Sequence, residues 1–69
     1  MAYNNRGIAY YVLGQYKRAI EDFDVAIQLN RGYANAYDWR GSAYFKLGQY
    51  ANADADEAKA CSLDSKYCD

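Results

Sequence analysis

The stretch AYYVLGQY, residues 9–16, returns as AYFKLGQY at residues 43–50, with six of its eight letters unchanged. The two copies lie 34 residues apart, and the agreement extends well beyond them. When residues 2–35 are aligned with residues 36–69, 15 of the 34 positions are identical and no gap is needed. A fixed period of about 20 to 50 residues is typical of a solenoid, in which each unit packs against the next.

Within one unit, the apolar pattern predicts two helices joined by a turn. Tyr3, Gly7 and Tyr10 share one face of a first helix, which we expect to end at Gly14. Residues 16–30 carry the pattern of a second amphipathic helix.

On the outer side of that second helix, Arg18 lies one turn before Asp22, so we expect these two side chains to pair. The second unit repeats the plan, with helices at about 34–47 and 50–63. The sequence therefore predicts an all-α chain of four antiparallel helices.

The motif in each unit resembles that of the tetratricopeptide repeat family, whose signature is W-x2-L-G-x2-Y, then A-x3-F, then P. The first unit reads Tyr3-x2-Arg6-Gly7-x2-Tyr10, followed by Ala19-x3-Phe23. The second reads Tyr37-x2-Arg40-Gly41-x2-Tyr44, followed by Ala53-x3-Glu57. The resemblance implies two helix-turn-helix units stacked as a short right-handed solenoid, and it covers essentially the whole chain.

The second unit departs from the first in its second helix. Ile20, Phe23 and Ile27 are replaced there by Asp54, Glu57 and Cys61. Because buried carboxylates need partners, we expect this helix to face water where a further repeat would dock. We expect the second unit to be the last of an array, and the tail SKYCD to begin a capping helix.

The family's proline is absent from both units, and residues 31 and 65 are Arg and Ser instead. Gly32 is then the main signal that ends the helix over 16–30. An alternative is that this helix runs on into the next one.

We treat residues 1–69 as one domain, with repeats at 2–35 and 36–69. Stacks of this kind usually need about three repeats or more for stability. We therefore expect either a fragment of a longer array or a unit that stacks on copies of itself.

Two cysteines are too few for a disulfide-stapled domain and favour a reducing, cytoplasmic location. Cys61 takes the place of Ile27, so we expect a small buried hydrophobic side chain. On one continuous helix, Cys61 and Cys68 would lie roughly 10 Å apart, which is beyond disulfide reach. Only a turn after Leu63 could bring them together.

The composition argues against several functions. The chain has no histidine, which removes the most common general base and metal ligand. Its formal charge of −1 does not suit a phosphate-binding surface, so we expect no nucleic-acid partner. We also expect no membrane span, no cofactor, no metal and no enzymatic activity.

The resemblance implies that the first helices of the two units line a concave groove for a peptide or helix of a partner protein. The expected groove residues are Asn4, Asn5, Ile8, Tyr11, Val12, Asn35, Asp38, Trp39, Ser42, Phe45 and Lys46. Trp39 could equally pack against a neighbouring helix. The alternative function is self-association into oligomers through the exposed faces of the end helices.

Some family members hold the acidic C-terminal tail of a chaperone with a clamp of Lys, Asn and Arg. In one register of this clamp, Asn4 and Ile8 stand where Lys and Asn are needed. In the other, Asn35 and Trp39 stand where Lys and Arg are needed. We therefore expect that chaperone tails are not the ligand.

Overall fold

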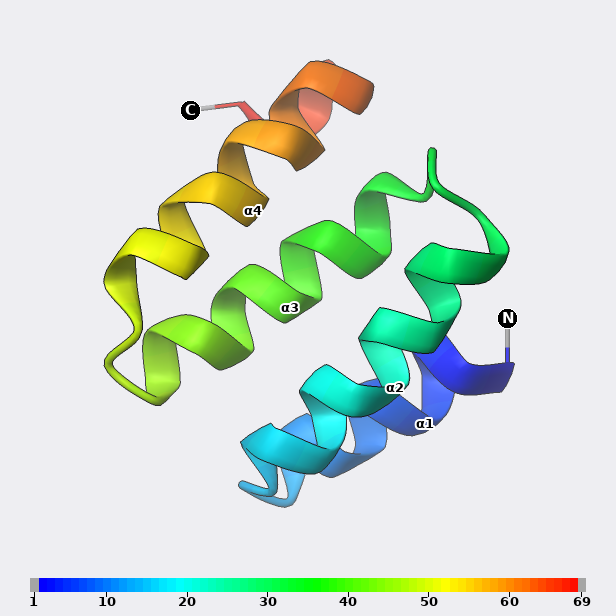
Figure 1. Cartoon of the computed structure of the whole chain (residues 1–69), viewed down its shortest axis with the longest axis vertical. Coiled ribbons are helices and arrows are strands. Elements are labelled where there is room, and N and C mark those ends of the chain that lie inside the picture. The colour runs from blue at the N-terminus through cyan, green and yellow to red at the C-terminus, as the bar shows by residue number, and fades with distance from the viewer. Residues whose placement is uncertain (1, 69) are drawn as a thin grey trace.

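The computed structural model describes residues 2–68 as four α-helices and a short final 3₁₀ helix. The elements are α1 (Ala2–Val12), α2 (Tyr16–Leu29), α3 (Ala34–Lys46), α4 (Tyr50–Leu63) and η1 (Ser65–Tyr67). Each helix runs back alongside the one before it, and α3 lies between α2 and α4 (Figure 1). Two helix-turn-helix units are thus packed side by side, as predicted.

The turn inside each unit depends on a glycine with positive φ. Gly14 has a φ of 80° and Gly48 a φ of 77°. This left-handed conformation carries little strain only without a Cβ, and it lets the next residue's N–H reach back into the helix. The N–H of Gln15 donates to the carbonyl of Tyr10 at 2.8 Å, and the second turn repeats this bond. The expected C-cap at Gly14 is confirmed.

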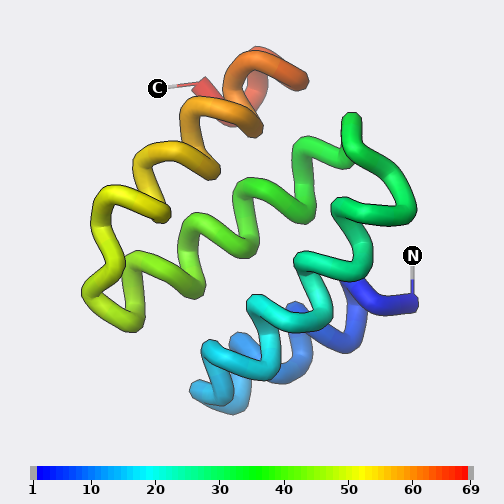
Figure 2. Tube along the Cα trace, viewed as in Figure 1, coloured from blue at the N-terminus to red at the C-terminus, as the bar shows by residue number. Residues whose placement is uncertain are grey.

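The connection between the units ends α2 without a proline. Asn30 has extended backbone, and its side-chain oxygen accepts a hydrogen bond from the N–H of Gly32 at 3.1 Å. This local bond gives the backbone an alternative to continuing the helix. The two helices are therefore separate, and the chain turns sharply between them (Figure 2).

Small side chains bring the helices close together. Ala19, Ala26, Ala36, Ala43 and Ala60 are fully buried. Phe23 is the largest fully buried side chain, and its ring lies directly over Gly7. Any Cβ at residue 7 would stand 2.7 Å from a carbon of that ring.

The repeat leaves one face of α1 open. Ala2 and Ala9 are exposed, although their equivalents Ala36 and Ala43 in the second unit are fully buried. The difference arises because α3 packs against α2, whereas no helix of the described residues covers the matching side of α1.

Arginine–aspartate pairs join the helices. Arg6 donates two hydrogen bonds of 2.8 Å to Asp22, and Arg40 does the same to Asp56. A further nitrogen of Arg40 reaches Asp24 of the first unit, also at 2.8 Å. The expected pairing of Arg18 with Asp22 is wrong, because the Asp22 carboxylate turns inward to Arg6 rather than along its own helix.

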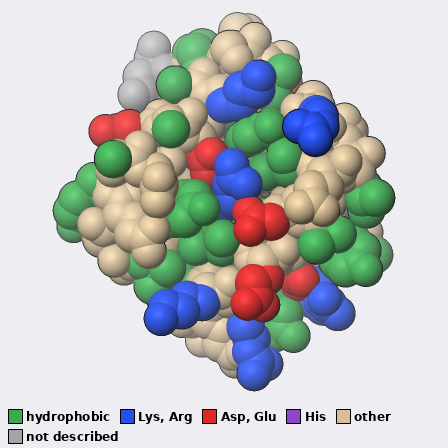
Figure 3. Space-filling model, in the orientation of Figure 1, with side chains coloured by type: hydrophobic (Ala, Val, Ile, Leu, Met, Phe, Trp, Pro, Cys, Tyr) green, Lys and Arg blue, Asp and Glu red, His purple; other side chains and the backbone are tan. Residues whose placement is uncertain are grey.

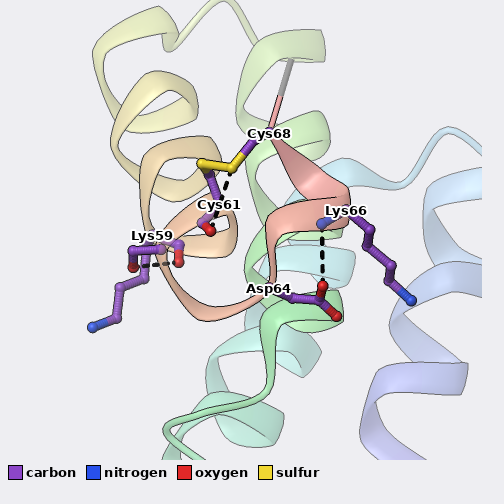
Figure 4. Close-up of a disulfide and its surroundings, with 6 residues drawn as sticks. Lys59, Cys61, Asp64, Lys66 and Cys68 are labelled. Atoms are coloured by element: carbon purple, nitrogen blue, oxygen red, sulfur yellow. Dashed lines mark hydrogen bonds between the residues drawn. A yellow bond between two sulfur atoms is a disulfide. The ribbon is translucent and has the colours of Figure 1, made fainter.

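The C-terminal tail is held by a disulfide between Cys61 and Cys68, whose Cα atoms lie 4.6 Å apart (Figure 4). The turn that permits it follows Leu63. The side chain of Asp64 accepts from the N–H of Lys66 at 3.1 Å and starts η1. The interpretation of Cys61 as a buried hydrophobic residue is wrong, and the tail forms a single 3₁₀ turn instead of opening an α-helix.

This disulfide bears on the expected compartment, because such bonds persist mainly where conditions are oxidising. The cytoplasmic location stays a prediction, and the Cys61–Cys68 bond argues against it. In the described part of the chain, none of the helices has the length and apolar character needed to cross a membrane.

Candidate functional site

Four of the expected groove residues line one hollow of about 330 Å³. Tyr11 comes from α1, and Ser42, Phe45 and Lys46 come from α3. The hollow continues between α3 and α4, where its remaining lining residues are Gly41, Ala53, Asp54 and Glu57. The fold thus brings together four of the predicted groove residues, and they come from both units.

An aromatic cluster defines one end of this region. Tyr11 meets Trp39 edge to face, with ring centroids 5.2 Å apart, and meets Tyr16 in the same way at 5.3 Å. Trp39 is half-buried in this contact. Trp39 therefore packs against Tyr11.

The second unit repeats the aromatic pair, but here the two rings are exposed. Phe45 and Tyr50 are the equivalents of Tyr11 and Tyr16, and their centroids lie 5.2 Å apart. Both are 59% exposed, because the described residues place no further helix beside them. Aromatic surface is thus available at the rim of the hollow.

Asn4 does not offer surface to a ligand. It is only 2% exposed, and its amide nitrogen donates to the side-chain oxygen of Asn35 at 2.9 Å and to the Tyr33 hydroxyl at 3.3 Å. Asn35 in turn donates to the Tyr67 hydroxyl at 3.1 Å. Its expected place on the groove surface does not fit this burial, and Asn4 instead ties α1 to the start of α3.

The other expected groove residues lie outside the lining of the hollow. Asn5 and Val12 are exposed, and Ile8 and Asp38 are half-buried. Val12 is the most exposed of the large apolar side chains, at 74%.

The charges around the hollow are mixed. Asp54 and Glu57 contribute carboxylates, and Lys46 contributes one ammonium group. Acidic and basic side chains also alternate over the face seen in Figure 3 instead of gathering by sign. Beside this region, burial raises the pKa of Tyr44, and nearby Arg40 partly offsets the rise.

The lining from α4 was missed by sequence reasoning, which placed the groove on the first helices alone. The available signal was the replacement of Phe23 by Glu57 at equivalent positions. The Arg–Asp pairs were missed too, although Arg6 and Asp22 both recur 34 residues later. Identity between the two copies marked the residues that hold the two helices of each unit together.

Among the described residues, no group of three metal-ligating side chains lies close enough to hold an ion.

Comparison with known families gives matches over almost the whole chain. A tetratricopeptide repeat model matches residues 1–33, and a second model of the same description matches residues 34–67. The chain belongs to the tetratricopeptide repeat family. Tetratricopeptide repeats are a protein-interaction fold without catalytic machinery of their own.

A solved tetratricopeptide structure shares the fold closely. It is the first such domain of Spaghetti (RPAP3) bound to the HSP90 peptide SRMEEVD, with 35% identity and a TM-score of 0.89. The match covers 91% of this chain and 50% of that one, so this chain spans half the length of its neighbour. No curated protein matches the sequence.

Proposed function

We propose that this tetratricopeptide chain is a protein-interaction scaffold that binds a peptide or helix of a partner protein in the groove lined by α1 and α3. The observation that carries the proposal is the hollow shared by Tyr11, Ser42, Phe45 and Lys46. Aromatic surface next to polar and charged groups suits a peptide, since it supplies both contact area and orientation. No catalytic role is proposed for any residue.

A selection from a random peptide library provides the direct test. Peptides selected on the full chain should lose most of their affinity for Phe45→Ala and Lys46→Ala, and keep it for Gln28→Ala. Phe45 and Lys46 are exposed, so their removal should leave the helical content unchanged, and Gln28 is an exposed control on α2. Peptides that bind all four proteins equally would place the binding surface elsewhere.

We further propose that the ligand is not an acidic chaperone tail, although the structural neighbour was solved with the HSP90 peptide SRMEEVD. Asn4 is buried, and Asn35 donates to Tyr67, so neither offers the cation that a carboxylate-rich tail needs. The peptide SRMEEVD should show no saturable binding to this chain. Salt-sensitive, saturable binding would contradict this part of the proposal.

Self-association is a second candidate, favoured by the exposed face of α1. Ala2, Ala9 and Leu13 face outward there, whereas their equivalents in the second unit are buried or half-buried. A second copy could supply the missing cover.

The two candidates differ in how the molar mass depends on concentration. Light scattering behind size exclusion should give a constant value near 7.9 kDa if the chain is a groove binder. A mass that rises with concentration would make self-association the leading function.

A further inference from the structure

The hollow between α3 and α4 lies where the second unit lacks an aromatic ring that the first unit has. In the first unit, the ring of Phe23 lies over Gly7 and is fully buried. The equivalent pair is Glu57 over Gly41, where a Cβ on residue 41 would stand 2.9 Å from a carboxylate oxygen of Glu57. Replacing a ring with a carboxylate thus leaves the seam open and puts an acid inside it.

The walls of the hollow suit a side chain that is apolar along its length and cationic at its tip. Gly41 and Ala53 form a small, apolar floor, and Asp54 and Glu57 supply carboxylates. Tyr11 and Phe45 provide aromatic faces at the rim, where a cation is attracted to the ring. Lys46 is the one cation among the lining residues, so carboxylates outnumber it.

We propose that this hollow is a subsite for an arginine side chain of the bound peptide. A guanidinium group stacks on aromatic rings and pairs with carboxylates through a planar fork of donors, which fits this lining better than an ammonium group. The stem of the side chain would cover the floor at Gly41 and Ala53. The inference rests on the proposed groove function and names the chemistry of its ligand.

Blocked five-residue peptides provide the test, with four glycines around a central arginine, norleucine or glutamate. On the ¹⁵N-labelled full chain with its disulfide intact, the arginine peptide should shift the amide signals of Gly41, Ser42 and Asp54. The norleucine peptide should bind about tenfold more weakly, because it keeps the apolar stem and loses the charge-assisted bonds. Equal binding of the arginine and norleucine peptides would overturn the proposal.

Two variants at residue 57 sharpen the test. Glu57→Phe restores the first unit's residue, so it should fill the hollow and abolish these shifts. Glu57→Gln keeps the size and should weaken the arginine peptide about tenfold. Glu21→Gln removes an exposed carboxylate of α2 that belongs neither to the expected groove residues nor to the lining of the hollow, and it should change nothing.

The variants also separate this inference from the proposed function. If library-selected peptides bind Glu57→Phe as tightly as the original chain, and arginine peptides do too, the groove stands and the arginine subsite is wrong. If no peptide of either kind binds any of these proteins, the groove itself fails.

Discussion

At the residue scale, the internal repeat offers matched pairs of positions whose surroundings differ. Gly7 and Gly41 are equivalent, but a Cβ at Gly7 would meet the rigid, buried ring of Phe23. At Gly41 it would first meet the end of the flexible Glu57 side chain. We therefore expect a glycine-to-alanine substitution to reduce stability by different amounts at the two positions.

We expect Gly7→Ala to lower the free energy of unfolding by about 1–3 kcal/mol, the usual cost of overpacking. Gly41→Ala should cost less, because the flexible Glu57 side chain can move. The next contacts, Asp56 at 3.2 Å and the Ala53 carbonyl oxygen at 3.3 Å, are looser than those to the Phe23 ring. The helix preference of alanine, about 1 kcal/mol, applies at both positions. Urea denaturation of both variants measures the difference. An equal loss would mean that the fit around Phe23 is no tighter than the fit around Glu57.

Arg40 pairs with two carboxylates, Asp56 of its own unit and Asp24 of the first unit. Among the described residues, Arg6 pairs with the carboxylate of Asp22. The Arg40 side chain is 20% exposed and Asp56 is 7% exposed, so removing the arginine leaves a nearly buried carboxylate behind. We expect Arg40→Ala to cost roughly 2–3 kcal/mol, just below the range for a fully buried pair.

Arg6→Ala is the matched control for that experiment. Asp22 is as buried as Asp56, at 7% exposed, so both variants leave a similar carboxylate behind. The loss should still be smaller, because the Arg6 side chain is 59% exposed and water screens its pair, whereas Arg40 also loses its bond to Asp24. Thermal unfolding of the two variants compares them directly, and a larger loss for Arg6→Ala would contradict the assigned role of Arg40.

The raised pKa of Tyr44 indicates how the free energy of unfolding should change at alkaline pH. Burial raises its pKa in the folded chain, so the folded state holds this proton more tightly than the unfolded state. Its contribution to stability is complete below the ordinary tyrosine pKa of about 10, and is lost as the pH rises through the folded value. Unfolding free energy should therefore fall above pH 10, and less steeply in Tyr44→Phe.

At the element scale, helix bounds follow from the sequence far better than the groove does. The ends of α4 agree with the predicted range of 50–63, because glycine turns and apolar spacing are local signals. The burial of Asn4 depends on Tyr33 and Asn35, which are about 30 residues further along the chain, and a local pattern does not contain such contacts. The hollow depends on the packing of Glu57 over Gly41, which likewise appears only in the folded chain.

The two cysteines of the disulfide can be compared with the residues at the same positions of the first unit. Cys61 and Cys68 correspond to Ile27 and Ala34, both of which are buried where α2 passes into α3. A covalent bond thus joins two positions that carry buried apolar side chains in the first unit.

Reduction with a dithiol should therefore loosen the tail. Opening the short loop between Cys61 and Cys68 should cost about 2–3 kcal/mol. The double variant Cys61→Ile, Cys68→Ala restores the residues of the first unit and should melt at a higher temperature than the reduced chain. No change in melting temperature on reduction would show that the bond holds only the tail and not α4.

At the whole-molecule scale, the two ends of the stack are chemically different. α1 presents the same side chains that α3 packs against α2, namely Ala2, Tyr3, Arg6, Ala9 and Tyr10. The outer side of α4 carries Asp54 and Ala58 where α2 has Ile20 and Asp24. A head-to-tail stack of copies would therefore lack the carboxylate that Arg40 finds in Asp24.

Ala58→Asp should supply that carboxylate and promote stacking. Its molar mass should rise at concentrations where the original chain stays constant, and Arg6→Ala in the same chain should reverse the rise. Light scattering checks both, and a constant mass for Ala58→Asp would show that this ion pair does not limit self-association.

The hydrogen-bonded series from Asn4 through Asn35 to Tyr67 also has a mechanical consequence. It runs from α1 to α3 to the tail along a single edge of the molecule, while the turns between α1 and α2 and between α3 and α4 lie at the opposite edge (Figure 1). We therefore expect the contact between α1 and α3 to be firmer at the bonded edge than at the edge of the glycine turns.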